Sequence, residues 1–282
     1  NNLHNIGIAI HNYHDNFKSF PPGLVGSGSA TAGNRAAGNT IVLNTTGWVL
    51  MAPYMDQAPL YNQYNFNLAS CAAKPTATGI VMGTGTNNEP HTGQRLEVLN
   101  CPSDPQGGEM VTNAGFGGGA HYDYRNARRI SYSFSSGIYL ERDNPWPMLD
   151  SRFRGAFGND GSAPISAITD GTSNTVAVGE TMQKKCHTNF GPFFAHGVWT
   201  GVFSRVTANY ERINAEPLDW ARSCNPGGRG FGPYAWVFSS HHEGGAHFVM
   251  CDGSARFVSE NIDFITLQNI RRTGDGNVIG EF

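Results

Sequence analysis

The sequence predicts an α+β fold in which one N-terminal helix packs across an antiparallel β-sheet. Three observations support this prediction. Apolar residues recur every three or four positions near the start of the chain, an alternating Ser and aromatic segment lies in the middle, and two alternating segments joined by Asp-Gly lie near the end. The first pattern is typical of an amphipathic helix and the other two of strands.

The helix is expected over residues 3–17. Its apolar residues are Leu3, Ile6, Ile10, Tyr13 and Phe17. We expect this stripe to be buried against the sheet, while Asn5, Asn12 and Asn16 face outward. Pro21 and Pro22 are expected to end the helix, because proline disfavours helix at the residue before it. The chain begins inside this periodicity without a capping residue, so we expect the helix to continue in a longer parent protein.

Residues 48–61 are dense in aromatic and aliphatic side chains and predict a second, short helical region, with Pro53 in its first turn. Residues 26–39 and 107–119 are rich in Gly and small residues and are expected to be exposed loops. A short strand is expected at 80–82.

The sheet is expected to contain residues 131–135, 175–180 and 198–203, together with a hairpin over 246–258. The alternation in 131–135 indicates a half-buried strand. Asp252-Gly253 predicts a type I′ turn, in which both central residues have positive φ. Ile165 and Ile168 predict a helical turn that stops at Asp170-Gly171.

Composition excludes several functions. The net charge of -3 and the pI near 6.4 argue against a nucleic-acid binder. The sequence contains no apolar run of about 18 residues, the length that would span a membrane. The five cysteines include no C-x-x-C pair, which argues against a zinc knuckle. The Gly117-Gly118-Gly119 run lacks the Gly-Lys-Ser/Thr of a phosphate loop, and no serine lies in a Gly-x-Ser-x-Gly elbow.

Imidazole and carboxylate side chains near the hairpin suggest a metal site. They are His241, His242, Glu243, His247, Asp252 and Glu180. Their spacing is not that of a helical H-E-x-x-H site, so we keep only Glu180, His242 and Asp252 as metal candidates, with calcium as the cation considered. We favour a structural role for His242, whose imidazole would hydrogen-bond Glu180 at the margin of the sheet. No cofactor is predicted.

Several motifs resemble those of one bacterial family. The opening Asn1-Asn2-Leu3 and Phe20-Pro21-Pro22-Gly23, the Cys101-Pro102-Ser103-Asp104 turn, and the string 168–175 followed by Val178-Gly179-Glu180 are such motifs. His242 lies ten residues before Asp252, which gives His-x9-Asp-Gly. The chain thus resembles the pilin-like family that has a prepilin-type N-terminal methylation segment, a large domain of unknown function and this C-terminal motif. The motif residues are His242, Asp252, Gly253, Asp170, Gly171 and Glu180.

The resemblance implies a pilin or pseudopilin head made of a truncated helix (1–20), a loop-rich insertion (21–130) and a sheet with the C-terminal hairpin (131–282). It implies a non-enzymatic structural subunit, extracellular or on the cell surface, that forms a homo-oligomer or filament and whose parent is anchored in a membrane. Cys186 and Cys224 flank one loop-rich segment, and we expect them to be paired if the location is extracellular. A surface solute-binding module and a metal-dependent hydrolase are the alternatives, the second less favoured.

Overall fold

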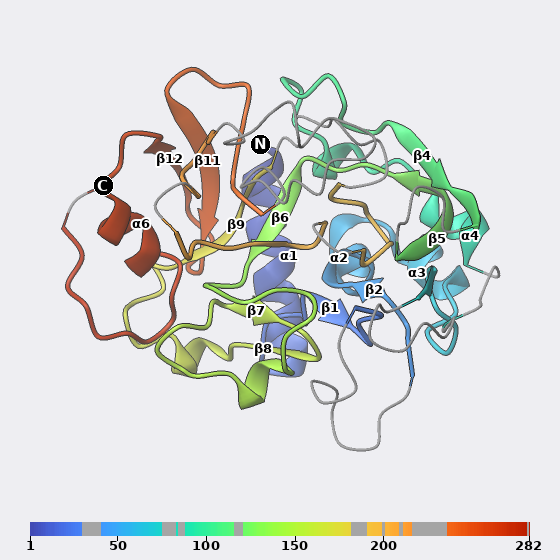
Figure 1. Ribbon diagram of the computed structural model, residues 1–282, viewed down its shortest axis with the longest axis horizontal. Coiled ribbons are helices and arrows are strands. Elements are labelled where there is room, and N and C mark those ends of the chain that lie inside the picture. The colour runs from blue at the N-terminus through green and yellow to red at the C-terminus, as the bar shows by residue number, and fades with distance from the viewer. Residues whose placement is uncertain are drawn as a thin grey trace.

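The computed structural model describes residues 1–29, 41–74, 83, 88–115, 121–181, 191–198, 201–208, 211–215, 236–280 and 282. It has the α+β fold expected from the sequence, with a helix at the N-terminus and several antiparallel or mixed sheets. In Figure 1, helix α1 crosses the middle of the molecule behind strand β6, with α6 and the β11–β12 hairpin on one side and β4 and β5 on the other. Within the described ranges no helix combines the length and the apolar character needed to cross a membrane.

Helix α1 spans Asn2–Phe17 and buries one face, as its periodicity predicts. Leu3, Ile6, Ile10 and Tyr13 lie in the main hydrophobic core. Asn5, Asn12 and Asn16 are exposed, which confirms the outward face.

One expectation about the end of this helix is wrong. Phe17 is 57% exposed although it lies on the apolar stripe. It belongs to the last turn, where its ring packs on Tyr13, at 4.4 Å between ring centroids. The helix ends at Phe17, as expected, and Lys18 closes it by adopting the left-handed conformation (φ 61°) and donating its N–H to the carbonyl of His14.

The main sheet has the strand order β10-β6-β9-β11-β12. Its strands are β6 (Tyr132–Ser135), β9 (Val176–Glu180), β10 (Phe203–Ser204), β11 (Gly245–Met250) and β12 (Ala255–Ser259). All four stretches expected in the sheet contribute to it. β10 pairs with β6 in parallel, whereas the other pairs are antiparallel.

The sheet is covered on both faces, which explains why β6 is fully buried rather than half-buried. Val249 of β11 belongs to the core that contains α1. The flanking Phe248 and Met250 belong to a second core with Leu267 of α6 (Phe264–Asn269). Alternate residues of a strand point to opposite faces, so α1 and α6 lie on opposite sides of the sheet.

The hairpin is present, but its turn is not type I′. Gly253 has a positive φ of 86°, whereas Asp252 is not among the residues with positive φ. Gly253 donates its N–H to the carbonyl of Met250 at 2.9 Å, and Met250 donates to Ser254 at 2.8 Å. A loop with one left-handed glycine after a type I-like turn accounts for this pattern, and it lets Asp252 keep an ordinary backbone conformation.

The segment 21–130 is less irregular than a loop-rich insertion. Its elements are β1 (Leu24–Val25), β2 (Thr45–Thr46), α2 (Gly47–Met51), η2 (Ala52–Met55), α3 (Ala58–Gln63), β3 (Ala72–Ala73), α4 (Glu89–Thr92), η3 (Glu97–Leu99), β4 (Met110–Asn113) and β5 (Tyr122–Arg128). The helical region expected at 48–61 is present, with Pro53 in the first turn of η2. β4 replaces part of the loop expected at 107–119. It pairs with β5, and its residues Val111 and Asn113 are buried.

The remaining short elements lie in the connection between β6 and β9. They are η5 (Trp146–Met148), β7 (Phe157–Gly158), β8 (Gly161–Ser162) and η6 (Ile165–Ala167). The helical turn expected near Ile165 is therefore present, and Gly171 follows it with φ 98°. The strand expected at 80–82, and most of the loop at 26–39, lie outside the described residues.

Candidate functional site

Three side chains from distant parts of the chain meet at one margin of the main sheet. Cys101 follows η3, Glu180 is the last residue of β9, and His242 lies in the connection that leads into β11. The Sγ of Cys101 lies 3.3 Å from Oε1 of Glu180 and 3.7 Å from Nε2 of His242. The same Nε2 lies 3.1 Å from Oε1 of Glu180. We call these three residues the Cys–Glu–His cluster.

Local backbone contacts hold each member in place. Asn2, in the first turn of α1, donates its side-chain amide to the carbonyl of Asn100 at 2.7 Å, which ties the loop before Cys101 to the helix. Glu180 is fixed by β9, which is paired on both sides with β6 and β11. The backbone N–H of His242 donates to the hydroxyl of Ser240 at 3.0 Å. The cluster therefore forms only when the N-terminal helix, the sheet and the hairpin are assembled.

The carboxylate of Glu180 is buried, with 5% of its side chain exposed. Its Oε2 accepts the backbone N–H of His247 at 2.8 Å, while Nδ1 of His247 lies 3.4 Å from the same oxygen. Its Oε1 faces Cys101 and His242. The hydrogen bond between His242 and Glu180 that the sequence leads us to expect is thus present.

The protonation of Cys101 follows from its surroundings. Burial raises the pKa of the Cys101 thiol to about 11, and the adjacent Glu180 carboxylate contributes in the same direction. At neutral pH and without a bound cation, Cys101 is therefore a thiol that donates to Glu180. A thiol in this state is a poor nucleophile.

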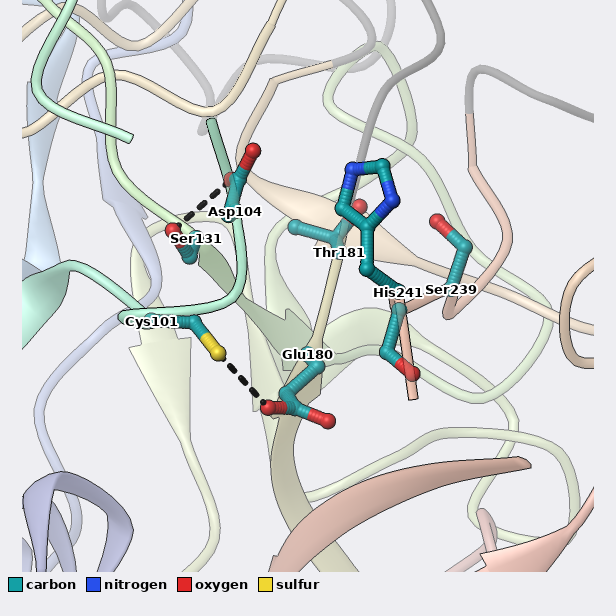
Figure 2. Close-up of a pocket in the computed structure, with 8 residues that line it drawn as sticks. Cys101, Asp104, Ser131, Glu180, Thr181, Ser239 and His241 are labelled. Carbon is teal, nitrogen blue, oxygen red and sulfur yellow. Dashed lines mark hydrogen bonds between the residues drawn. The ribbon is translucent and has the colours of Figure 1, made fainter. Parts of the chain in front are cut away.

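A small pocket opens beside the cluster. Its lining residues are Cys101, Asp104, Ser131, Glu180, Thr181, Ser239, Ser240 and His241. Figure 2 shows the sulfur of Cys101 pointing at the Glu180 carboxylate, while the ring of His241 points away from it. Ser131 donates its hydroxyl to Asp104 at 2.8 Å on the far wall. The enclosed space is only about 10 Å³, which is room for about one water molecule and far below the roughly 300 Å³ of common small-molecule sites.

The structure separates Asp252 from the other two metal candidates. Asp252 lies in the exposed turn at the far end of β11, where its Oδ1 accepts from Ser254. A strand of six residues spans about 20 Å, so Asp252 cannot share a metal ion with His242. Of the three metal candidates, only Glu180 and His242 therefore lie together.

The other motif residues have local structural contacts. Asp170 accepts the backbone N–H groups of Asp275 and Gly276, at 2.7 and 3.0 Å, which ties the end of η6 to the C-terminal segment. Gly253 packs under α1: a Cβ on Gly7 would lie 2.8 Å from its carbonyl oxygen. Cys186 and Cys224, expected to be paired, both lie outside the described residues.

Sequence reasoning missed Cys101 as a member of the cluster. The Cys101-Pro102-Ser103-Asp104 turn was recognisable, but nothing in the sequence places it beside Glu180, 79 residues away. The only signal was that both segments belong to motifs of one family.

The chain matches a known protein family. No curated protein and no solved structure shows significant similarity to the chain. A family model with the label SBP_bac_10, described as "Protein of unknown function (DUF1559)", matches residues 1–264. Since this match covers most of the chain, the protein belongs to that family of unknown function.

Proposed function

We propose that this chain is the head of a non-enzymatic, pilin- or pseudopilin-like subunit of the cell surface. It assembles with copies of itself through α1 and through a membrane anchor that precedes α1 in the parent protein. The observation that carries this proposal is the position of α1: its apolar face packs on the main sheet while its outer face stays exposed. This is the architecture that the resemblance to pilin-like proteins implies.

The outer face of α1 gives assembly a surface. It is mostly polar, but Ile8 is 47% exposed in its centre. Asn5 and Asn12 flank Ile8 and are exposed as well. A partly apolar centre with hydrogen-bonding neighbours suits contact between helices of neighbouring copies.

The candidate site does not have the geometry of a cysteine-nucleophile triad. In a Cys-His-Glu triad the carboxylate orients the imidazole through the nitrogen that does not face the nucleophile. In this structure Nε2 of His242 faces both Cys101 and Glu180. The pocket is also smaller than solute-binding sites usually are, so we rank a solute-binding module below the structural subunit.

Electron microscopy of the native full-length protein, sheared from cells and negatively stained, tests the proposal. We expect regular fibres or short filaments. Ile8→Glu should reduce assembly strongly, because it places a charge in the centre of the outer face of α1 without touching the core.

Ile265→Glu is the matched control, since Ile265 in α6 is also exposed, at 57%, but lies across the sheet from α1. It should assemble like the wild type. A native protein that stays monomeric at all concentrations, or an Ile8→Glu variant that assembles normally, would contradict assembly through α1.

A further inference from the structure

We propose that the Cys–Glu–His cluster is a zinc site, with Cys101, Glu180 and His242 as three protein ligands and a water molecule at the fourth position, on the side of the pocket. This inference is independent of the proposed assembly. It rests on the distances between the three ligand atoms, on the charge of the cluster and on the chemistry of the donors.

The three ligand atoms already lie at the corners of one face of a zinc tetrahedron. Zinc binds sulfur at about 2.3 Å and nitrogen or oxygen at about 2.0–2.1 Å. In a tetrahedron these bond lengths place sulfur about 3.6 Å from its neighbours, and nitrogen about 3.4 Å from oxygen. The structure has 3.3 Å for Cys101 to Glu180, 3.7 Å for Cys101 to His242 and 3.1 Å for His242 to Glu180.

The charge of the cluster also favours a bound cation. Glu180 is buried, and buried carboxylates are normally paired with a cation or bound to a metal. Its ion-pair contacts are with His242 and His247, at 3.1 and 3.4 Å, and each imidazole carries a charge only when it is protonated. A divalent ion would supply the missing charge and would bind Cys101 as a thiolate.

The donor set selects zinc over calcium. Calcium takes six to eight oxygen ligands, and this cluster offers one carboxylate, one imidazole and one thiol. Sulfur and imidazole donors are typical of zinc sites. The calcium considered from the sequence is therefore the less suitable ion.

Neighbouring groups complete the site. The backbone N–H of His247 holds Oε2 of Glu180 at 2.8 Å and leaves Oε1 free to face the metal position. Outer contacts of this kind orient metal ligands and raise affinity. Cys101 and Glu180 also line the pocket, so a water ligand fits on that side.

Metal analysis of the whole chain, stripped with a chelator and reloaded, tests the inference. We expect one equivalent of tightly bound zinc that depends on these three residues. Loading with cobalt(II) in place of zinc should give a thiolate-to-cobalt charge-transfer band, and added zinc should raise the melting temperature. Cys101→Ala should remove the band and weaken zinc binding at least tenfold.

Cys251→Ala is the matched control, because Cys251 is also buried but lies at the far end of the hairpin. It should bind zinc and cobalt like the wild type. If Cys101→Ala does not fold, His242→Gln provides the same test and should keep the thiolate band but with weaker affinity. A wild-type protein that takes up no zinc, or unchanged uptake in both variants, overturns the inference.

Discussion

The two ends of the His-x9-Asp-Gly motif do different things in this protein. At the His end, the contacts are between side chains: the imidazole of His242 contacts the buried carboxylate of Glu180 and the thiol of Cys101. At the Asp-Gly end, the contacts are made by the backbone: Gly253 has a left-handed conformation, and its carbonyl packs against Gly7 of α1. The strand β11 keeps the two ends about 20 Å apart.

The difference teaches that a spacing in the sequence does not indicate a shared site. A ten-residue interval that runs along one extended strand to its turn places its two ends at opposite margins of the sheet. Each end instead meets a separate segment of the chain, the Cys101 turn at one margin and α1 at the other. Substitutions should therefore affect the two ends through different physical mechanisms.

The largest expected effect is at the contact between α1 and the hairpin turn. Gly7→Leu places a side chain where even a Cβ would lie 2.8 Å from the carbonyl of Gly253 and 3.3 Å from Val249. Since both neighbours are held in the core, α1 must shift. We expect a loss of about 3 kcal/mol or more in the free energy of unfolding, as in severe overpacking.

Asn12→Leu is the control for this substitution, because it introduces the same side chain on the exposed face of α1. It should change stability by less than about 0.5 kcal/mol. Denaturant unfolding followed by circular dichroism measures both variants. Equal stability of Gly7→Leu and wild type would show that the hairpin turn does not pack on the helix.

The next effect is an acid loss of stability that could be wrongly assigned to His242. His196 is fully buried, and neither of its ring nitrogens has a hydrogen-bond partner among the described residues. Burial lowers its pKa from 6.5 to about 3 in the folded protein. The unfolded chain therefore binds a proton first, so the stability that His196 contributes is complete above pH 6.5 and is lost as the pH falls toward 3.

His196→Leu should flatten the decline of the melting temperature between pH 6.5 and 4, by several degrees. His4→Gln, which changes an exposed histidine of α1, should leave the decline unchanged. If the fall in melting temperature persists in His196→Leu but disappears in His242→Ala, His242 and not His196 causes the acid sensitivity.

At the His end we expect a moderate effect. His242→Ala, measured with a chelator present, removes the hydrogen bond to Glu180 and should cost about 1–3 kcal/mol. Glu180→Gln should cost less, because the amide oxygen can still accept the N–H of His247 and its NH₂ group can donate to His242. Added zinc or calcium should not restore His242→Ala. Thermal unfolding that ranks Glu180→Gln below His242→Ala in stability would contradict this account.

The sequence predicted the elements that depend on local patterns. The apolar period of residues 3–13 identified the buried face of α1, and the Asp-Gly pair identified the hairpin. It failed for Phe17, because the pattern does not show where the sheet ends beneath the helix. It also failed for β4 and β5, whose burial depends on partners distant in the sequence.

The candidate site was predicted only in part for the same reason. Glu180 ends a recognisable strand and His242 precedes another, so their contact could be inferred from antiparallel pairing of the two strands. Cys101 comes from a separate turn that Asn2 of α1 holds in place. No spacing rule relates that turn to the sheet, so only the tertiary structure brings it into the cluster.

The smallest expected effect is at Asp252, in the other half of the motif. Its side chain is exposed and accepts hydrogen bonds from the backbone N–H and the hydroxyl of Ser254, at 2.9 and 2.6 Å. Such local bonds stabilise a turn modestly, so Asp252→Ala should cost about 0.5–1 kcal/mol, and Asp252→Asn less because its amide oxygen can accept the same bonds. Zinc uptake should be unchanged in both variants. A loss above about 2 kcal/mol, or weaker zinc binding, would mean that the two ends of the motif are coupled through β11, because the contacts at the turn alone cannot account for either result.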